Sequence, residues 1–72
     1  MTHRYLVVIE RAGRNYSAYS PDLPGCVATG ATREETRTRM QQAIARHLEG
    51  LREDHQPIPE PGASAEVVEV AV

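Results

Sequence analysis

The side chains that could carry out nucleophilic or metal chemistry are few in this sequence, and they are scattered. The single cysteine, Cys26, follows a Pro-Gly pair, and a nucleophilic thiol needs a neighbouring base and some exposure to solvent. No base is identifiable beside it from the sequence. The histidines His3, His47 and His55 lack the short spacing of zinc ligands. We therefore expect Cys26 to be a small buried side chain, His47 to be packed or half-buried, and no metal or cofactor site.

Clustered carboxylates are the second kind of chemistry to consider, because two-metal nucleases hold their ions with such clusters. The acids at loosely suitable places are Glu10, Glu49 and Glu69. With ten acidic residues among 72, three such positions are expected by chance. The sequence therefore predicts a protein that is not an enzyme, with a degenerate metal-dependent nuclease as the alternative.

A recognition side chain is the third possibility, and Asp22 is the candidate. It lies between Pro21 and Pro24, and Pro24-Gly25 suits the central positions of a type II turn, where glycine takes a positive φ at little cost. The Asp22 carboxylate could contact a partner, or it could accept a hydrogen bond from a backbone N–H two residues further on. The two roles are compatible.

Composition and charge exclude several classes of partner. The chain has 72 residues and a net charge of −2, which gives no electrostatic reason to bind DNA or RNA. No apolar run approaches the ~20 residues of a membrane span, and the N-terminus does not match a signal peptide. One cysteine allows no internal disulfide and fits a reducing compartment. We expect a single cytoplasmic domain over residues 1–72, without membrane insertion.

The hydrophobic pattern predicts the elements that position these residues. Residues 5–9 form an apolar, β-branched run typical of a buried strand. A turn at residues 12–15 predicts a hairpin with a second strand at 16–20. A third short strand is predicted at 26–29, directly after the Pro-Gly turn.

The second half of the sequence predicts one long helix and a final strand. Thr32 and Glu35 form a capping box, which predicts a helix over 33–53. Its apolar positions recur at helical spacing on one face: Met40, Ala43, Ile44, Leu48 and Leu51. Three prolines between 57 and 61 predict an extended connection, and alternating valines predict a strand over 65–72.

These elements predict an α+β fold of the order β-β-β-α-β. The final strand returns parallel to the first by a right-handed crossover, which gives the sheet order 3-2-1-4 with the first strand central. One helix covers one face of such a sheet. The other face then needs cover, most simply from another subunit or a partner protein.

The segment from Tyr16 to Gly30, Tyr-Ser-Ala-Tyr-Ser-Pro-Asp-Leu-Pro-Gly-Cys-Val-Ala-Thr-Gly, with the Ala-Thr-Arg-Glu-Glu that follows it, resembles the HicB family of type II toxin–antitoxin antitoxins. Residues 48–51 and 57–61 resemble the same family. The resemblance extends from about residue 5 to 61. It implies a partial ribonuclease H-like fold without nuclease chemistry, and a protein that binds and inhibits a HicA-type mRNA endoribonuclease whose fold is that of a double-stranded-RNA-binding domain.

Two departures from the family pattern matter. Many members carry a C-terminal DNA-binding domain, and the sequence up to Val72 contains none, so we expect no direct DNA binding from this chain. Ser20 and Ala31 replace residue types that are common in the family, which bears on partner specificity. We expect the toxin-contacting residues in the central segment: Tyr19, Pro21, Asp22, Leu23 and Pro24.

The leading hypothesis is a HicB-like antitoxin that self-associates, as a dimer or tetramer, and neutralises a HicA-like toxin ribonuclease. The alternatives are the degenerate nuclease, with Glu10 as its testable acid, and an orphan module that assembles only with itself or with small ligands.

Overall fold

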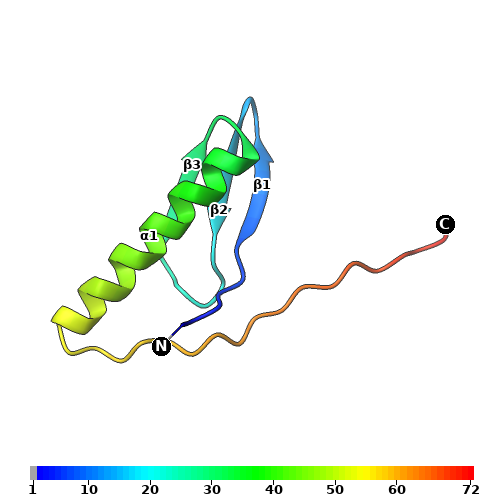
Figure 1. Ribbon diagram of the computed structural model, residues 1–72. Coiled ribbons are helices and arrows are strands. Elements are labelled where there is room, and N and C mark those ends of the chain that lie inside the picture. Colours follow the sequence, from blue (N-terminus) through cyan, green and yellow to red (C-terminus); the bar gives the residue numbers. More distant parts are fainter. Residues whose placement is uncertain (1) are drawn as a thin grey trace.

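A three-stranded antiparallel sheet packs one face against a single long helix (Figure 1). The computed structural model describes residues 2–72. The strands are β1 (Val8–Ala12), β2 (Asn15–Tyr19) and β3 (Val27–Gly30), and the helix is α1 (Arg33–Glu53). The sheet order is β1-β2-β3. The predicted α+β class and the order of the first four elements are confirmed.

The β1–β2 hairpin turns on two residues, Gly13 and Arg14. Gly13 has φ +63°, as the first position of a type II′ turn requires. This turn places Ala12 opposite Asn15 and Val8 opposite Tyr19. The register therefore moves the first strand from the predicted 5–9 to Val8–Ala12, because the pairing must start at the turn.

Two successive turns connect β2 to β3. The N–H of Leu23 donates to the carbonyl of Ser20, and the N–H of Cys26 donates to that of Leu23, each at 3.1 Å. Gly25 has φ +81°, so the predicted type II turn at Pro24-Gly25 is confirmed. The same turns bury Leu23 to 1% exposure. The third strand starts one residue later than the predicted 26–29, since Cys26 belongs to the second turn.

The passage from β3 into α1 needs a glycine at position 30. A Cβ there would lie 2.6 Å from Thr36 Oγ1 and 2.9 Å from its backbone N. Thr36 is fully buried, and its hydroxyl donates to the carbonyl of Thr32 at 2.7 Å. The Thr32 side chain in turn accepts from the N–H of Glu35 at 3.0 Å, so the predicted N-cap is confirmed. The Glu35 carboxylate pairs with Arg39 at 2.5 Å.

The helix ends as the sequence predicts, at Glu53, and its end has a Schellman geometry. The N–H of Gln56 donates to the carbonyl of Leu51, and that of His55 to Arg52. His55 takes the left-handed position with φ +56°, where glycine is the usual residue. The chain reverses there and heads back along the helix.

The core lies between the sheet and α1. Its buried apolar residues are Ala18, Leu23, Cys26 and Met40, and Val7, Ile9, Ile44 and Leu48 are among the half-buried side chains around them. The predicted apolar face of α1 is confirmed for Met40, Ala43, Ile44 and Leu48, which belong to this core or pack against it. Ala18 pairs with Ile9 on one side and Ala28 on the other, which places the small residues of the sheet directly under the helix.

The predicted fourth strand is wrong. Residues 56–72 contain no strand, and the sheet order is β1-β2-β3, not 3-2-1-4. β2 is therefore the central strand, and β1 is an edge. In Figure 1 the segment after α1 passes the residues that precede β1 and then leads away from the body.

Two contacts explain the path of this segment. The Tyr5 hydroxyl donates to the carbonyl of Pro59 at 2.5 Å. One carboxylate oxygen of Asp22 accepts from the N–H groups of Gly62 and Ala63, both at 3.1 Å. These bonds carry the chain across the end of the sheet to the turn after β2. Beyond them nothing in residues 2–72 pairs with the backbone, so the alternating valines form no strand.

Candidate partner-binding surface

The sheet face opposite α1 has no cover from residues 2–72. Because Ala18, Ile9 and Ala28 face the helix, their strand neighbours point to the other side. On that side Val8 lies opposite Tyr19, and Tyr19 lies opposite Val27. Tyr19 is 42% and Val27 64% exposed. We call Val8, Tyr19 and Val27 the apolar row.

A polar row follows the apolar row on the same face. The register places Glu10 opposite Ser17, and Ser17 opposite Thr29. Glu10 and Thr29 are exposed. The open face thus combines an apolar strip across all three strands with a carboxylate on β1, a mixture typical of protein-binding surfaces.

The five residues predicted to contact a partner lie in and beside the turns at one end of this face. Tyr19, Pro21 and Pro24 are exposed, Asp22 is half-buried, and Leu23 is buried in the core. The Asp22 carboxylate holds the backbone of residues 62 and 63 instead of capping its own turn. The sequence pattern did not predict Val8 and Val27, the other two residues of the apolar row. Only the strand register shows that they lie beside Tyr19.

Cys26 is a core residue. It is 5% exposed, and burial raises the pKa of its thiol, which keeps the thiol protonated at neutral pH. His47 and Cys26 line the same shallow hollow, a proximity that the sequence did not reveal. The raised pKa is the opposite of what a nucleophilic cysteine needs, so the geometry favours the packing role predicted for Cys26.

The acids that could suggest a nuclease do not meet. Within residues 2–72, no three His, Cys, Asp or Glu side chains lie close enough to hold a metal ion. Glu10 belongs to the sheet face opposite the helix that carries Glu49, and Glu69 lies in the extended C-terminal segment.

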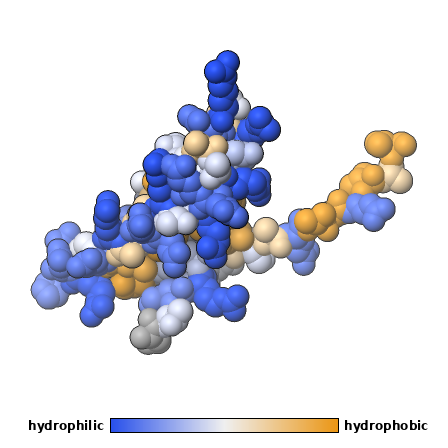
Figure 2. All heavy atoms as spheres, turned by 45° about the horizontal axis from the view of Figure 1, so that its top comes forward, coloured by the Kyte–Doolittle hydropathy of each residue, from blue (hydrophilic) through white to orange (hydrophobic). Residues whose placement is uncertain are grey.

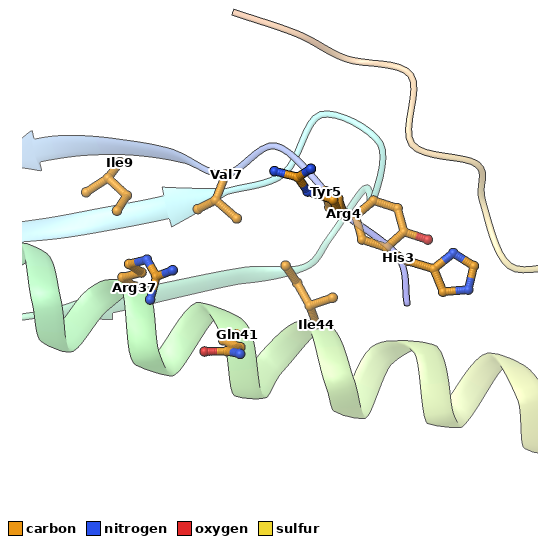
Figure 3. Close-up of a pocket in the computed structure, with 8 residues that line it drawn as sticks. All are labelled: His3, Arg4, Tyr5, Val7, Ile9, Arg37, Gln41 and Ile44. Atoms are coloured by element: carbon orange, nitrogen blue, oxygen red, sulfur yellow. The ribbon is translucent and has the colours of Figure 1, made fainter. Parts of the chain in front are cut away.

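A groove of about 470 Å³ lies between the β1 edge and α1. Figure 3 shows Val7 and Ile9 pointing from the β1 side towards Arg37, Gln41 and Ile44 on the helix. His3, Arg4 and Tyr5 line the same groove. Its floor is apolar and two arginines flank it.

Tyr5 lies towards one end of the groove, next to His3 (Figure 3). Burial, with the nearby carboxylates of Glu60 and Asp22, raises the pKa of its phenol above the usual 10.0. The hydroxyl is therefore protonated at neutral pH and available to donate to Pro59.

No helix in residues 2–72 has the length and apolarity that a bilayer span requires. No solved structure matches the chain.

Three curated proteins are similar in sequence. An uncharacterised 14.9 kDa protein from the rep–hol intergenic region of Haemophilus phage HP1 is 36% identical over 55 residues, 76% of this chain and 41% of that protein. A UPF0150 protein of Synechocystis is 36% identical over 58 residues, 79% of this chain and 73% of that protein. A UPF0150 protein of Thermoplasma acidophilum is 31% identical over 61 residues, 83% of this chain and 88% of that protein. The chain thus spans less than half of the phage relative.

The sequence model of the family described as "HicB_like antitoxin of bacterial toxin-antitoxin system" matches residues 5–71. This range includes the hairpin, both turns after β2, the whole helix and nearly all of the extended segment. The chain belongs to the HicB-like antitoxin family of bacterial toxin–antitoxin systems.

Proposed function

We propose that this protein is a non-catalytic antitoxin that neutralises a HicA-type mRNA endoribonuclease by direct binding. Family membership supplies the class of activity. The observation that carries the proposal is the open sheet face, where the apolar row crosses all three strands without cover. An exposed apolar strip of this kind on a small domain is characteristic of an interaction surface.

The chemistry of this face suits a ribonuclease. An RNA-cleaving protein must attract phosphates, so its substrate-binding surface is basic. The Glu10 carboxylate lies on the open face beside the apolar row. It offers a counter-charge to such a surface while Tyr19 and Val27 supply apolar contact area. Tyrosine is enriched among the residues that dominate binding energy.

The exposed turn residues extend the surface at one end. Pro21 and Pro24 are exposed beside Tyr19, so we propose them as rim contacts. Asp22 and Leu23 contribute indirectly, because Leu23 anchors the turn in the core and Asp22 holds the C-terminal segment. Inhibition requires no chemistry from the antitoxin; it occludes the toxin's active surface.

Co-expression tests the function. We expect the neighbouring gene to encode the toxin. That gene is induced in a bacterial host, and growth is measured with and without this protein, together with co-purification of the two chains. We expect wild-type protein to restore growth and to co-purify with the toxin. If it does neither, the proposed function is wrong.

Matched variants test the surface. Val27→Glu places a charge in the apolar row, and Ala45→Glu places the same charge on an exposed position of α1. We expect Val27→Glu to weaken toxin binding about tenfold or more, as loss of a central apolar contact does, and Ala45→Glu to bind as wild type. Circular dichroism establishes that both variants are folded. Equal binding by both would exclude the open face as the toxin site.

We also propose that the protein self-associates, as a dimer or tetramer, and acts in the cytoplasm, where its mRNA-cleaving target works. The support for self-association is the exposed valines of the C-terminal segment and the unpaired β1 edge.

A further inference from the structure

The outer edge of β1 is a ready template for another strand. β1 pairs with β2 on one side, and no other strand of residues 2–72 lies beside it. Edge strands present unpaired N–H and C=O groups, which makes them sites for strand addition from another chain. The groove that contains Val7, Ile9 and Ile44 lies beside the start of β1 and the residues that lead into it. An added strand would therefore gain both backbone hydrogen bonds and an apolar floor.

Residues 65–72 have the composition of the missing strand. We call them the arm. Four of the eight are exposed valines, with exposed fractions from 72% at Val70 to 125% at Val72. Figure 2 shows the arm as an apolar stretch that stands away from a largely hydrophilic body. Leaving these side chains in water forgoes the free energy that burial of valine provides, about 1.5 kcal/mol or more each.

We propose that the arm of one copy pairs along the β1 edge of a second copy, and that the second copy returns its own arm in the same way. Each groove is then closed by the partner's arm in a two-fold symmetric exchange, a common route to dimers. This specifies the self-association proposed above. It does not depend on toxin binding.

The lengths agree. The arm has eight residues, and residues 5–12, from the groove tyrosine to the end of β1, are also eight. At about 3.3 Å per residue each spans roughly 26 Å. The alternation agrees as well, since Val68, Val70 and Val72 share one side of an extended strand. That side would face the groove floor.

The charges are complementary. The arm carries two carboxylates, Glu66 and Glu69, and the groove is flanked by Arg4 and Arg37. The one ion pair among the described residues is Glu35–Arg39, so neither groove arginine has an acidic partner among them. An acidic, valine-rich strand matches a groove with an apolar floor and arginines on its margin.

The arm's path favours a second copy over its own β1. The bonds from Asp22 to Gly62 and Ala63 fix the base of the arm across the end of the sheet. From there the arm leads away from its own β1 edge (Figure 1). Because its valine side chains stay exposed, the arm can reach an identical edge on a second copy.

Charge reversal in two separate chains tests the exchange. The arm variant carries Glu66→Arg and Glu69→Arg; the groove variant carries Arg4→Glu and Arg37→Glu. All four side chains are exposed, so folding is preserved. Alone, each variant sets like charges against each other. Mixed, the arginine arm of one meets the glutamate groove of the other, and the glutamate arm of the second meets the arginine groove of the first.

Light scattering over a range of concentrations measures the molar mass of the wild type, of each variant alone and of the equimolar mixture. We expect a wild-type dimer, dissociation constants at least about tenfold higher for each variant alone, and restored dimers in the equimolar mixture. Variants that stay as dimeric as wild type, or a mixture that stays monomeric, would refute the exchange. A monomeric wild type whose arm amides are protected from hydrogen exchange would show instead that the arm folds onto its own β1.

A second pair of variants separates the exchange from self-association through another face. Val68→Asp with Val70→Asp alters the side of the arm that faces the groove. Val67→Asp with Ala71→Asp adds the same charge to the opposite side. We expect the first pair to abolish the dimer and the second to retain it. A dimer that survives both would leave self-association correct and the arm exchange wrong, whatever the outcome of the toxin assay.

Discussion

Single residues determine where this chain changes direction. His55 ends the helix in a left-handed conformation, Gly30 allows β3 to approach Thr36, and Asp22 binds the backbone forty residues further along the sequence. The roles of His55 and Gly30 depend on geometry within a few residues of each. The third depends on a distant backbone, whereas the sequence suggested a partner contact or a local turn cap for Asp22.

Replacing His55 with glycine should stabilise the fold. A non-glycine residue in the left-handed region costs about 1–2 kcal/mol, of which part is offset by the greater freedom of glycine in the unfolded chain. We expect His55→Gly to raise the free energy of unfolding by about 0.5–1 kcal/mol in urea titrations. His55→Ala, which keeps the strain, serves as the control and should bring no such gain; a loss of stability on His55→Gly would contradict the assignment of the Schellman end.

Gly30 and Gly50 should respond in opposite directions to the same substitution. A Cβ at Gly30 would meet the backbone N of buried Thr36 at 2.9 Å, whereas a Cβ at Gly50 meets nothing within 4 Å. We expect Gly30→Ala to destabilise the protein by about 1–3 kcal/mol through overpacking. Gly50→Ala should stabilise it by about 0.5–1 kcal/mol through helix propensity. Thermal melts of the two variants test this prediction. A change in melting temperature of the same sign for both would show that the close approach between Gly30 and Thr36 is not maintained.

At the scale of elements, local signals specified every element whose partners lie nearby in sequence. The N-cap at Thr32, the helix bounds and the Pro24-Gly25 turn are as predicted. Strand bounds shifted by up to three residues, because ladder pairing starts at the hairpin turn and not at the most apolar run. The C-terminal valines have a strand-like pattern but no neighbouring strand in residues 2–72, so the pattern produced no element.

The Tyr5–Pro59 bond couples the start of the chain to the extended segment and gives it a pH dependence. The folded-state pKa of Tyr5 is raised above 10.0, so its contribution is fully present below pH 10 and is lost as pH rises through the folded pKa. We expect Tyr5→Phe to reduce stability by about 0.5–1.5 kcal/mol at pH 7. The deficit should vanish at high pH, where wild type also loses the bond. Urea midpoints measured from pH 7 to 12 test this, with Tyr19→Phe as the control. A deficit that is independent of pH would mean that the hydroxyl does not donate to Pro59.

At the scale of the whole molecule, the small core gives the monomer only a modest free energy of unfolding. In the part of the chain that the structure describes, four apolar side chains are buried, one sheet face is open, and the arm is exposed. Domains of this size commonly depend on association for part of their stability. Arm exchange would bury the valines and close the groove at the same time.

The melting temperature should therefore depend on protein concentration. For a dimer, each tenfold dilution lowers the midpoint by roughly 3–5 °C for a domain of this length. We expect this in calorimetry of the wild type between about 5 and 500 micromolar, where mass action governs the equilibrium. The Val68→Asp, Val70→Asp variant should melt at a temperature independent of concentration. A wild-type midpoint that does not move would exclude coupled folding and association.

The sequence by itself determined the family, the helix with its cap, the turn at Pro24-Gly25 and the buried side of α1. All of these depend on residues close in the chain or on a motif that is legible along it. The tertiary structure decided that β2 is central, that Val8 and Val27 flank Tyr19, and that Asp22 binds Gly62 and Ala63. It also left β1 as an open edge beside a groove. These features depend on register and on contacts between residues far apart in sequence, which the hydrophobic pattern of a single chain does not encode.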